Sequence, residues 1–233
     1  MRIPYDPPVP LGRQFIELAP EIVAAILRTL TAGWRQACEF SDVNAQAGEV
    51  PLTERLRDGM RGELKSKACP WRKTLIVLPG TESRSSSGVL TPDGRTDIPL
   101  VLIEVFLRTE EHDPHAIIEC KRIAGSETHL CREYVVEGID RFATGKYGEN
   151  HAVGFMVGYV LSGTATESVD GINAYLTRAS RKVDALEPSY VCSEAASWRS
   201  RHVRTKSSSP IQLHHAFLGL AAERQPMVIC SSA

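Results

Sequence analysis

The apolar run HAVGFMVGYVL at 151–161 constrains the fold of this chain more than any other segment. It is too short to cross a membrane, which takes about 18 residues or more, and its glycine and valine content disfavours a helix. A continuous apolar run of this kind is typical of a strand that is buried on both faces of a helix-covered sheet. We therefore expect 151–161 to be a central strand.

Helical periodicity appears on both sides of this run. Apolar residues recur at helical spacing in four segments: from Pro20 to Trp34, and over 52–68, 126–143 and 169–186. Thr164 and Glu167 have the spacing of a capping box before the last of these helices, and Pro188 is expected to stop it.

The remaining apolar segments have the length and composition of strands. We expect strands at 74–78, 98–107, 116–123 and 151–161, and two further pieces within 189–206 and 211–220. The strands at 98–107 and 116–123 are expected to form a hairpin. The order of elements predicts an α/β fold with a mixed β-sheet flanked by helices. We assign 1–48 to an N-terminal arm and helical extension, and 49–233 to the main domain.

Charge and cysteine content exclude several classes of protein. Lys and Arg number 27 and Asp and Glu 28, a net charge of −1, so binding of nucleic acid through bulk charge is not expected. The closest cysteines, Cys120 and Cys131, are too far apart for a Cys-x-x-Cys zinc or redox pair. The N-terminus lacks the pattern of a signal peptide. We expect free thiols, no membrane association and a cytoplasmic location.

Acidic and basic side chains converge on two of the predicted strands. Asp97 directly precedes the strand at 98–107, and Glu119 and Lys121 lie on the next strand. Because side chains alternate along a strand, Glu119 and Lys121 point to one face, and Cys120 points to the other. Two carboxylates and an ammonium group are therefore expected at one edge of the sheet.

Such a group of side chains suits phosphodiester hydrolysis. Two close carboxylates repel unless a cation lies between them. Hard oxygen ligands with open positions favour Mg²⁺, which takes a substrate phosphate as a further ligand and activates a bound water. A lysine beside that water can orient it or help to deprotonate it.

The motif of Asp97 followed by Glu119-Cys120-Lys121 resembles that of the PD-(D/E)xK nuclease superfamily, over about residues 49–161. The resemblance implies a restriction-endonuclease-like sheet. It also implies that Asp97, Glu119 and the carbonyl of Cys120 bind Mg²⁺, with Mn²⁺ as a substitute, and that Lys121 serves the attacking water.

A glutamate from the helix before the first strand joins the site in many members of this superfamily. The candidates here are Glu49, Glu54 and Glu63, and Glu49 is included among the expected catalytic residues. The sequence departs from the family motif at Thr96, where the motif has proline.

A second resemblance involves residues 134–147 and the run GFMVGYV that follows. This stretch is similar to restriction-like effectors of bacterial defence systems. The two resemblances together imply a metal-dependent DNA endonuclease that acts in antiviral defence, as a homo-oligomer or with partner subunits that dock on the N-terminal helices. The alternatives are a catalytically silent scaffold of the same fold and a nuclease directed at RNA.

Two further features bear on substrate binding. The acidic stretch 82–119, of net charge −5, lies between the basic stretches 55–73 and 178–206, of net charge +5 and +4. Basic segments beside an acidic metal centre favour contact with a phosphate backbone. Lys146 and Tyr147 are candidate phosphate contacts, although Gly145 is equally well explained as a helix C-cap.

Overall fold

The apolar run at 151–161 forms β6 (Val153–Ser162), a central strand that is buried on both faces along most of its length. This confirms the expectation drawn from its composition. The structure is a computed structural model, and it describes residues 15–83, 94–193, 195–204 and 209–220. The proline-rich arm at 1–14 lies outside the described residues.

The described residues form one sheet of seven strands, in the order β1-β4-β5-β6-β9-β8-β7. The strands other than β6 are β1 (Leu75–Val77), β4 (Ile98–Leu102), β5 (Ala116–Ala124), β7 (Glu187–Ser189), β8 (Ser197–His202) and β9 (Ile211–Gly219). The neighbours β5, β6 and β9 run parallel, whereas all other pairs are antiparallel. A short hairpin of β2 (Glu82–Ser83) and β3 (Gly94–Arg95) precedes β4. The sheet is mixed, as expected.

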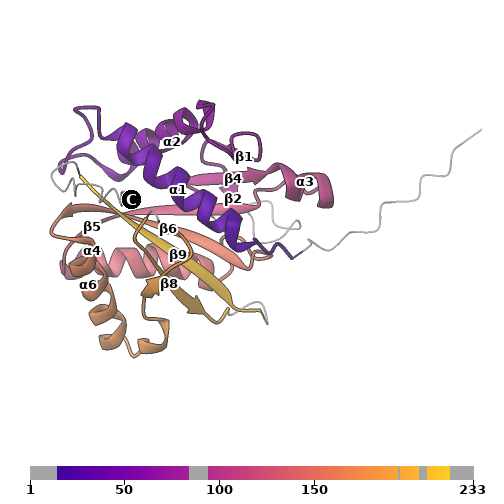
Figure 1. Cartoon of the computed structure of the whole chain (residues 1–233). Helices are drawn as coiled ribbons and strands as arrows, with labels where there is room; N and C mark the ends of the chain where they lie inside the picture. The colour runs from indigo at the N-terminus through magenta and orange to yellow at the C-terminus, as the bar shows by residue number, and fades with distance from the viewer. Residues whose placement is uncertain (1–14, 84–93, 194, 205–208, 221–233) are drawn as a thin grey trace, which may run out of the picture.

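Helices cover both faces of this sheet. They are α1 (Pro20–Ala37), α2 (Glu49–Lys65), α3 (Ile103–Thr109), α4 (Thr128–Tyr134), a π-helical turn η1 (Val135–Ile139), α5 (Asp140–Ala143), α6 (Ala165–Arg178) and a 3₁₀ turn η2 (Lys182–Asp184). Figure 1 shows α1 and α2 above the sheet, and α4 and α6 below it. The capping box at Thr164 and Glu167 is present at the start of α6.

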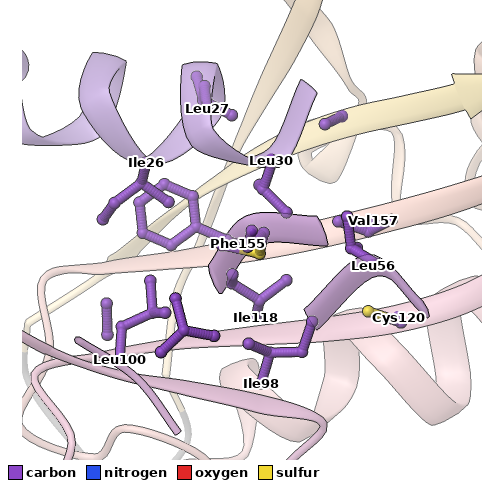
Figure 2. Packing of buried hydrophobic residues seen from close by; sticks show 14 of the residues in the cluster. Ile26, Leu27, Leu30, Leu56, Ile98, Leu100, Ile118, Cys120, Phe155 and Val157 are labelled. Atoms are coloured by element: carbon purple, nitrogen blue, oxygen red, sulfur yellow. The ribbon is translucent and has the colours of Figure 1, made fainter. Parts of the chain in front are cut away.

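Two hydrophobic clusters hold these layers together, one on each face of the sheet. In Figure 2, Leu30 of α1 and Leu56 of α2 point toward Phe155 and Val157 of β6. The second cluster joins α4, η1 and α6 to the opposite face, where Met156 is fully buried. Both N-terminal helices share one core with the sheet, so the boundary at residue 48 falls between two helices of the same layer.

The apolar faces of the two N-terminal helices are covered by the chain's own sheet, so only their exposed faces are open to a partner. Ile26, Leu27 and Leu30 of α1, and Leu52 and Leu56 of α2, are all at most 1% exposed. These side chains pack on the sheet because its upper face would otherwise be open to water.

Of the strand expected over 98–107, only the first half is a strand in the structure. Residues 98–102 form β4, but the chain then turns into α3. Neighbouring strands explain the change, because β5 begins at Ala116, opposite Leu100, and β1 ends the ladder at the Leu75–Leu102 pair. Residues beyond 102 have no strand to pair with, and a helix satisfies their backbone groups internally. The expected antiparallel pairing of β4 with β5 is confirmed.

The helix expected over 169–186 ends earlier, at Arg178. Ser180 adopts a left-handed conformation with φ of 59°, and the N–H of Arg181 donates to the carbonyl of Leu176, which closes the helix as in a Schellman motif. Val183 continues the apolar spacing but is 91% exposed. The last part of the periodic pattern therefore does not report burial.

No helix within the described ranges combines the length and the apolar character that crossing a membrane requires. None of the five cysteines in these ranges forms a disulfide. Cys230 lies outside the described residues.

Candidate active site

The site lies at a fork between two antiparallel strands. β4 pairs with β5 only as far as Ile98 opposite Ile118, and β5 then continues alone on this side to Ala124. Asp97 directly precedes β4 and sits at the opening of the fork. Its Oδ2 accepts a hydrogen bond of 2.7 Å from the backbone N–H of Cys120. One carboxylate is thereby fixed beside the free portion of β5.

Glu119 and Lys121 of β5 project from the same face, as the alternation of side chains predicts. Lys121 Nζ lies 2.9 Å from Glu119 Oε1 and donates a 2.8 Å hydrogen bond to the carbonyl of Cys120. Glu119 is fully buried and Lys121 is 6% exposed. The Cys120 side chain is buried in the upper core, so its backbone faces the site while its thiol does not.

Of the three candidate glutamates, the fold brings Glu49 to the site. It is the first residue of α2, and its Oε1 lies 2.9 Å from Lys121 Nζ. Glu54 instead pairs with Arg57, and Glu63 accepts a hydrogen bond from a side chain of α1. The helix begins earlier than the expected residue 52, and this early start places Glu49 over the fork.

Two residues of the site were not expected in these roles. Arg141 Nη1 donates hydrogen bonds to Glu119 Oε1, at 2.9 Å, and to the Tyr147 hydroxyl, at 2.7 Å. The Tyr147 hydroxyl in turn donates to the carbonyl of Arg95, two residues before Asp97. This chain of contacts ties the two strands that carry the carboxylates to each other. The only sequence signal for Arg141 was its place in the 134–147 stretch, whose resemblance gave it no role.

Tyr147 does not serve as the phosphate contact that was expected, because it is fully buried. The preceding Gly145 has φ of 75°, in the left-handed region that glycine favours, directly after the end of α5. The alternative explanation, a helix C-cap at Gly145, is therefore confirmed.

The π-helical turn η1 shapes the floor of the site. Gly138 lies against β5 and β6, and a Cβ atom there would stand 2.5 Å from Met156 Cε and 3.5 Å from Lys121 Cγ. Glycine thus leaves room for the Lys121 stem. The extra residue of the π turn changes the direction of the helix surface before Arg141, and single π turns of this kind occur often at functional sites.

The charges of the five ionisable side chains in the site do not sum to zero. Glu49, Asp97 and Glu119 supply three carboxylates, whereas Lys121 and Arg141 supply two cations, so the fully ionised group carries −1. Burial, followed by the charge of Asp97, raises the pKa of Glu119 to about 8. Burial also raises the pKa of Asp97. A proton shared by these carboxyl groups removes the excess charge.

The pKa of Lys121 shifts upward, which is the direction that keeps its ammonium group charged. Burial favours its neutral form, but the nearby charges of Glu119, Glu49 and Asp97 outweigh burial and raise the pKa of the ammonium group. Lys121 is therefore a protonated hydrogen-bond donor at neutral pH in the metal-free protein, and not a base.

The donor atoms of the site suit a hard divalent cation. Glu119 Oε2 is buried and has no hydrogen-bond partner in the described chain. Asp97 lies close enough to Glu119 for its charge to contribute to the raised pKa of that carboxyl group. Among the described residues, no group of three or more His, Cys, Asp and Glu side chains could hold a metal ion. The oxygen set here comprises two carboxylates and the Cys120 carbonyl, so its third member belongs to the backbone.

No family model, curated protein or solved structure matches this chain. The residues of the fork are therefore the basis on which a function can be inferred.

Proposed function

We propose that this protein is a metal-dependent nuclease of the PD-(D/E)xK type, with a restriction-endonuclease-like sheet, that hydrolyses phosphodiester bonds of DNA. The observation that carries the proposal is the meeting of Asp97, Glu119 and Lys121 at the β4–β5 fork. Glu119 is a fully buried carboxyl group with a lysine ammonium beside it, and half-buried Asp97 lies at the opening of the same fork.

The charge of the site supports a divalent cation. Mg²⁺, or Mn²⁺ in its place, would be held by Asp97, Glu119 and the carbonyl of Cys120. A divalent ion changes the net charge of the five-residue group from −1 to +1, and one phosphodiester anion then neutralises it. When bound, the ion lowers the pKa of a coordinated water and stabilises negative charge on the phosphate.

The chain's own residues orient the reactants. Glu49, Glu119 and the Cys120 carbonyl together engage the three N–H groups of Lys121 and fix its ammonium group beside the carboxylates. A water or a phosphate oxygen would take the place of one of these acceptors. Arg141 holds Glu119 Oε1, so Oε2 is the oxygen that would bind the cation. The positive charge of Lys121 also stabilises the negative charge that develops on the phosphate during attack.

The proposal extends to the biological role. One site cuts one strand, so cleavage of a duplex requires a homo-oligomer. A nuclease must also be restrained in its own cell, and the part of the chain that the structure describes holds no separate module for choosing a target. We therefore include in the proposal that partner subunits control it as an effector of antiviral defence.

Cleavage assays test this function directly. Purified protein would be incubated with plasmid DNA, linear duplex and single-stranded RNA, in Mg²⁺, Mn²⁺ or EDTA. We expect metal-dependent cleavage of DNA that falls by about 10²-fold or more in Lys121→Ala and Glu119→Gln, as is typical when a charge-stabilising group is removed. Arg108→Ala serves as the control, since Arg108 is an exposed cationic side chain on α3, outside the site and outside both basic stretches.

Two outcomes would contradict the proposal. Cleavage that persists in Lys121→Ala would show that this site is not responsible. No cleavage by the wild type, together with no binding of Mg²⁺ or Mn²⁺ in calorimetry, would favour the scaffold. Cleavage confined to RNA would retain the chemistry and reassign the substrate.

A further inference from the structure

A second polar hollow adjoins the candidate active site. It has a volume of about 130 Å³ and lies between the first turns of α2 and the segment that leads into β4. Asp97 lines one side of it and is shared with the fork. The hollow also contains two arginines, Arg57 from α2 and Arg95 from β3.

Arg57 is held in place by an ion pair, but not all of its N–H donors are used. Its side chain is 13% exposed and its guanidinium lies 3.3 Å from Glu54, which is 56% exposed. Its Nε is buried and has no hydrogen-bond partner in the described chain. An arginine in this state retains donors for an anion, since a buried N–H without an acceptor is unfavourable.

Arg95 approaches the hollow from the opposite side. Its side chain lies over Gly80, where a Cβ atom would come within 3.0 Å of Arg95 Nε and 2.5 Å of the Thr96 carbonyl. Within the described ranges, no carboxylate forms an ion pair with Arg95, and the residue is exposed. Its backbone carbonyl is fixed by Tyr147, so the base of this side chain is anchored to the active site.

We propose that this hollow binds the backbone phosphate next to the one that is cleaved, through Arg57 and Arg95. The proposal rests on the proposed nuclease function and deepens it by naming the substrate class. Arginine guanidinium groups recognise phosphate through paired hydrogen bonds. With a divalent ion bound, the neighbouring site balances one phosphodiester. With Asp97 counted in that site, Arg57, Arg95 and Glu54 leave the hollow a net charge of +1, which matches one further phosphodiester. The substrate is therefore a polynucleotide strand, and not an isolated diester.

Binding without catalysis gives the first test. Anisotropy of labelled oligonucleotides, as DNA and as RNA, would be measured in EDTA over a range of salt concentrations for Arg95→Gln and Arg57→Gln. We expect each variant to bind roughly threefold to tenfold more weakly, with a salt dependence shallower by about one counterion. Arg108→Gln is the matched control, because Arg108 is an exposed arginine on α3 that lies outside both basic stretches.

A small diester gives the second test. Bis(p-nitrophenyl) phosphate carries a single diester and no neighbouring phosphate. We expect Arg95→Gln to hydrolyse it within twofold of the wild-type kcat/KM, while its kcat/KM for an oligonucleotide falls severalfold. Equal losses for both substrates would overturn the proposal, because Arg95 would then act on the reacting phosphate or on folding.

The outcomes separate this proposal from the proposed function. Unchanged oligonucleotide affinity and salt dependence in both arginine variants would overturn the second phosphate site, even if the wild type cleaves DNA. Weaker binding in both variants, with a wild type that cleaves nothing, would support the phosphate site and count against hydrolysis.

Discussion

The two carboxylate oxygens of Glu119 have different surroundings. Oε1 faces Lys121 and Arg141, each at 2.9 Å, whereas Oε2 is buried with no partner in the described chain. An unsatisfied buried oxygen is costly, typically by about 1–3 kcal/mol or more when charged. The buried position of Glu119 is therefore favourable only when a proton or a cation binds Oε2.

The pKa of Glu119 leads to a prediction about stability. Its ordinary pKa is 4.5 and its pKa in the folded protein is about 8, so between these values the folded state binds more protons than the unfolded state. Folding stability should then fall as pH rises from about 4.5 to 8, by up to about 1.4 kcal/mol per unit. Thermal unfolding without metal should show this decline in the wild type and lose it in Glu119→Gln.

Thermal unfolding with an added divalent cation tests the same carboxyl group in a second way. Because Mg²⁺ or Mn²⁺ competes with the proton, it should raise the melting temperature more at pH 8.5 than at pH 6. Parallel pH profiles for wild type and Glu119→Gln would show that Glu119 is not the group responsible.

Single residues differ in how far the sequence alone could place them. Glu119 and Lys121 follow from the alternation of a strand, which is a local property. Glu49 could not be distinguished from Glu54 and Glu63, because all three lie on one helix and the choice depends on which turn faces the fork. Arg141 was not expected, because its role in the site depends on its hydrogen bond to Glu119, which is distant in sequence. No local pattern marks such a contact.

At the scale of elements, the segment from α4 to α5 shows how a helix can serve two purposes. Its apolar side chains Tyr134, Val135, Ile139 and Phe142 are fully buried under the sheet. The π turn between them brings Gly138 against the Lys121 stem and lets Arg141 reach Glu119. One helix thereby covers the core and completes the site.

Gly138→Ala tests this arrangement. The new methyl group would stand 2.5 Å from Met156 Cε, in a fully buried environment, and would also reach the Lys121 stem. We expect a loss of about 1–3 kcal/mol in the free energy of unfolding, from denaturant titration. Gly48→Ala is the comparison, since a Cβ there meets only Pro51 at 3.6 Å. Gly48 is the N-cap of α2, so we expect only the weaker N-cap preference of alanine to act, at a cost of at most about 1 kcal/mol. Equal stability of the two variants would contradict the tight contact.

Elements were predicted less well where their ends depend on neighbours. The apolar pattern of 98–107 contains both β4 and α3, because pairing stops where the adjacent strands stop. The pattern of 169–186 overestimates α6, because the chain leaves the sheet after Arg178 and places Val183 in water. Periodicity reports which residues are apolar, but it does not report where a neighbouring element ends.

At the scale of the whole molecule, α1 is a structural part of the sheet domain. Leu30 is fully buried above β6, and the indole N–H of Trp34 donates a 2.7 Å hydrogen bond to the carbonyl of Gly219 at the end of β9. Figure 2 shows the α1 side chains directed into the same core as those of α2, β4 and β5.

This packing predicts a large cost for a cavity under α1. Leu30→Ala should lower the free energy of unfolding by about 2–5 kcal/mol in chemical denaturation, as is typical of a fully buried leucine. Arg35→Ala, at an exposed position of the same helix, should change it by less than about 0.5 kcal/mol. A small effect of Leu30→Ala would indicate that α1 is a separate appendage.

The sequence by itself determined the α/β class, the central strand at 151–161 and the shared face of Glu119 and Lys121. These are consequences of local periodicity, because burial on one or both faces leaves a repeating pattern along the chain. Only the tertiary structure decided that Glu49 and Arg141 complete the site. Glu49 meets Lys121 across 72 positions of sequence and Arg141 meets Glu119 across 22, and such distances are set by how helices pack on the sheet.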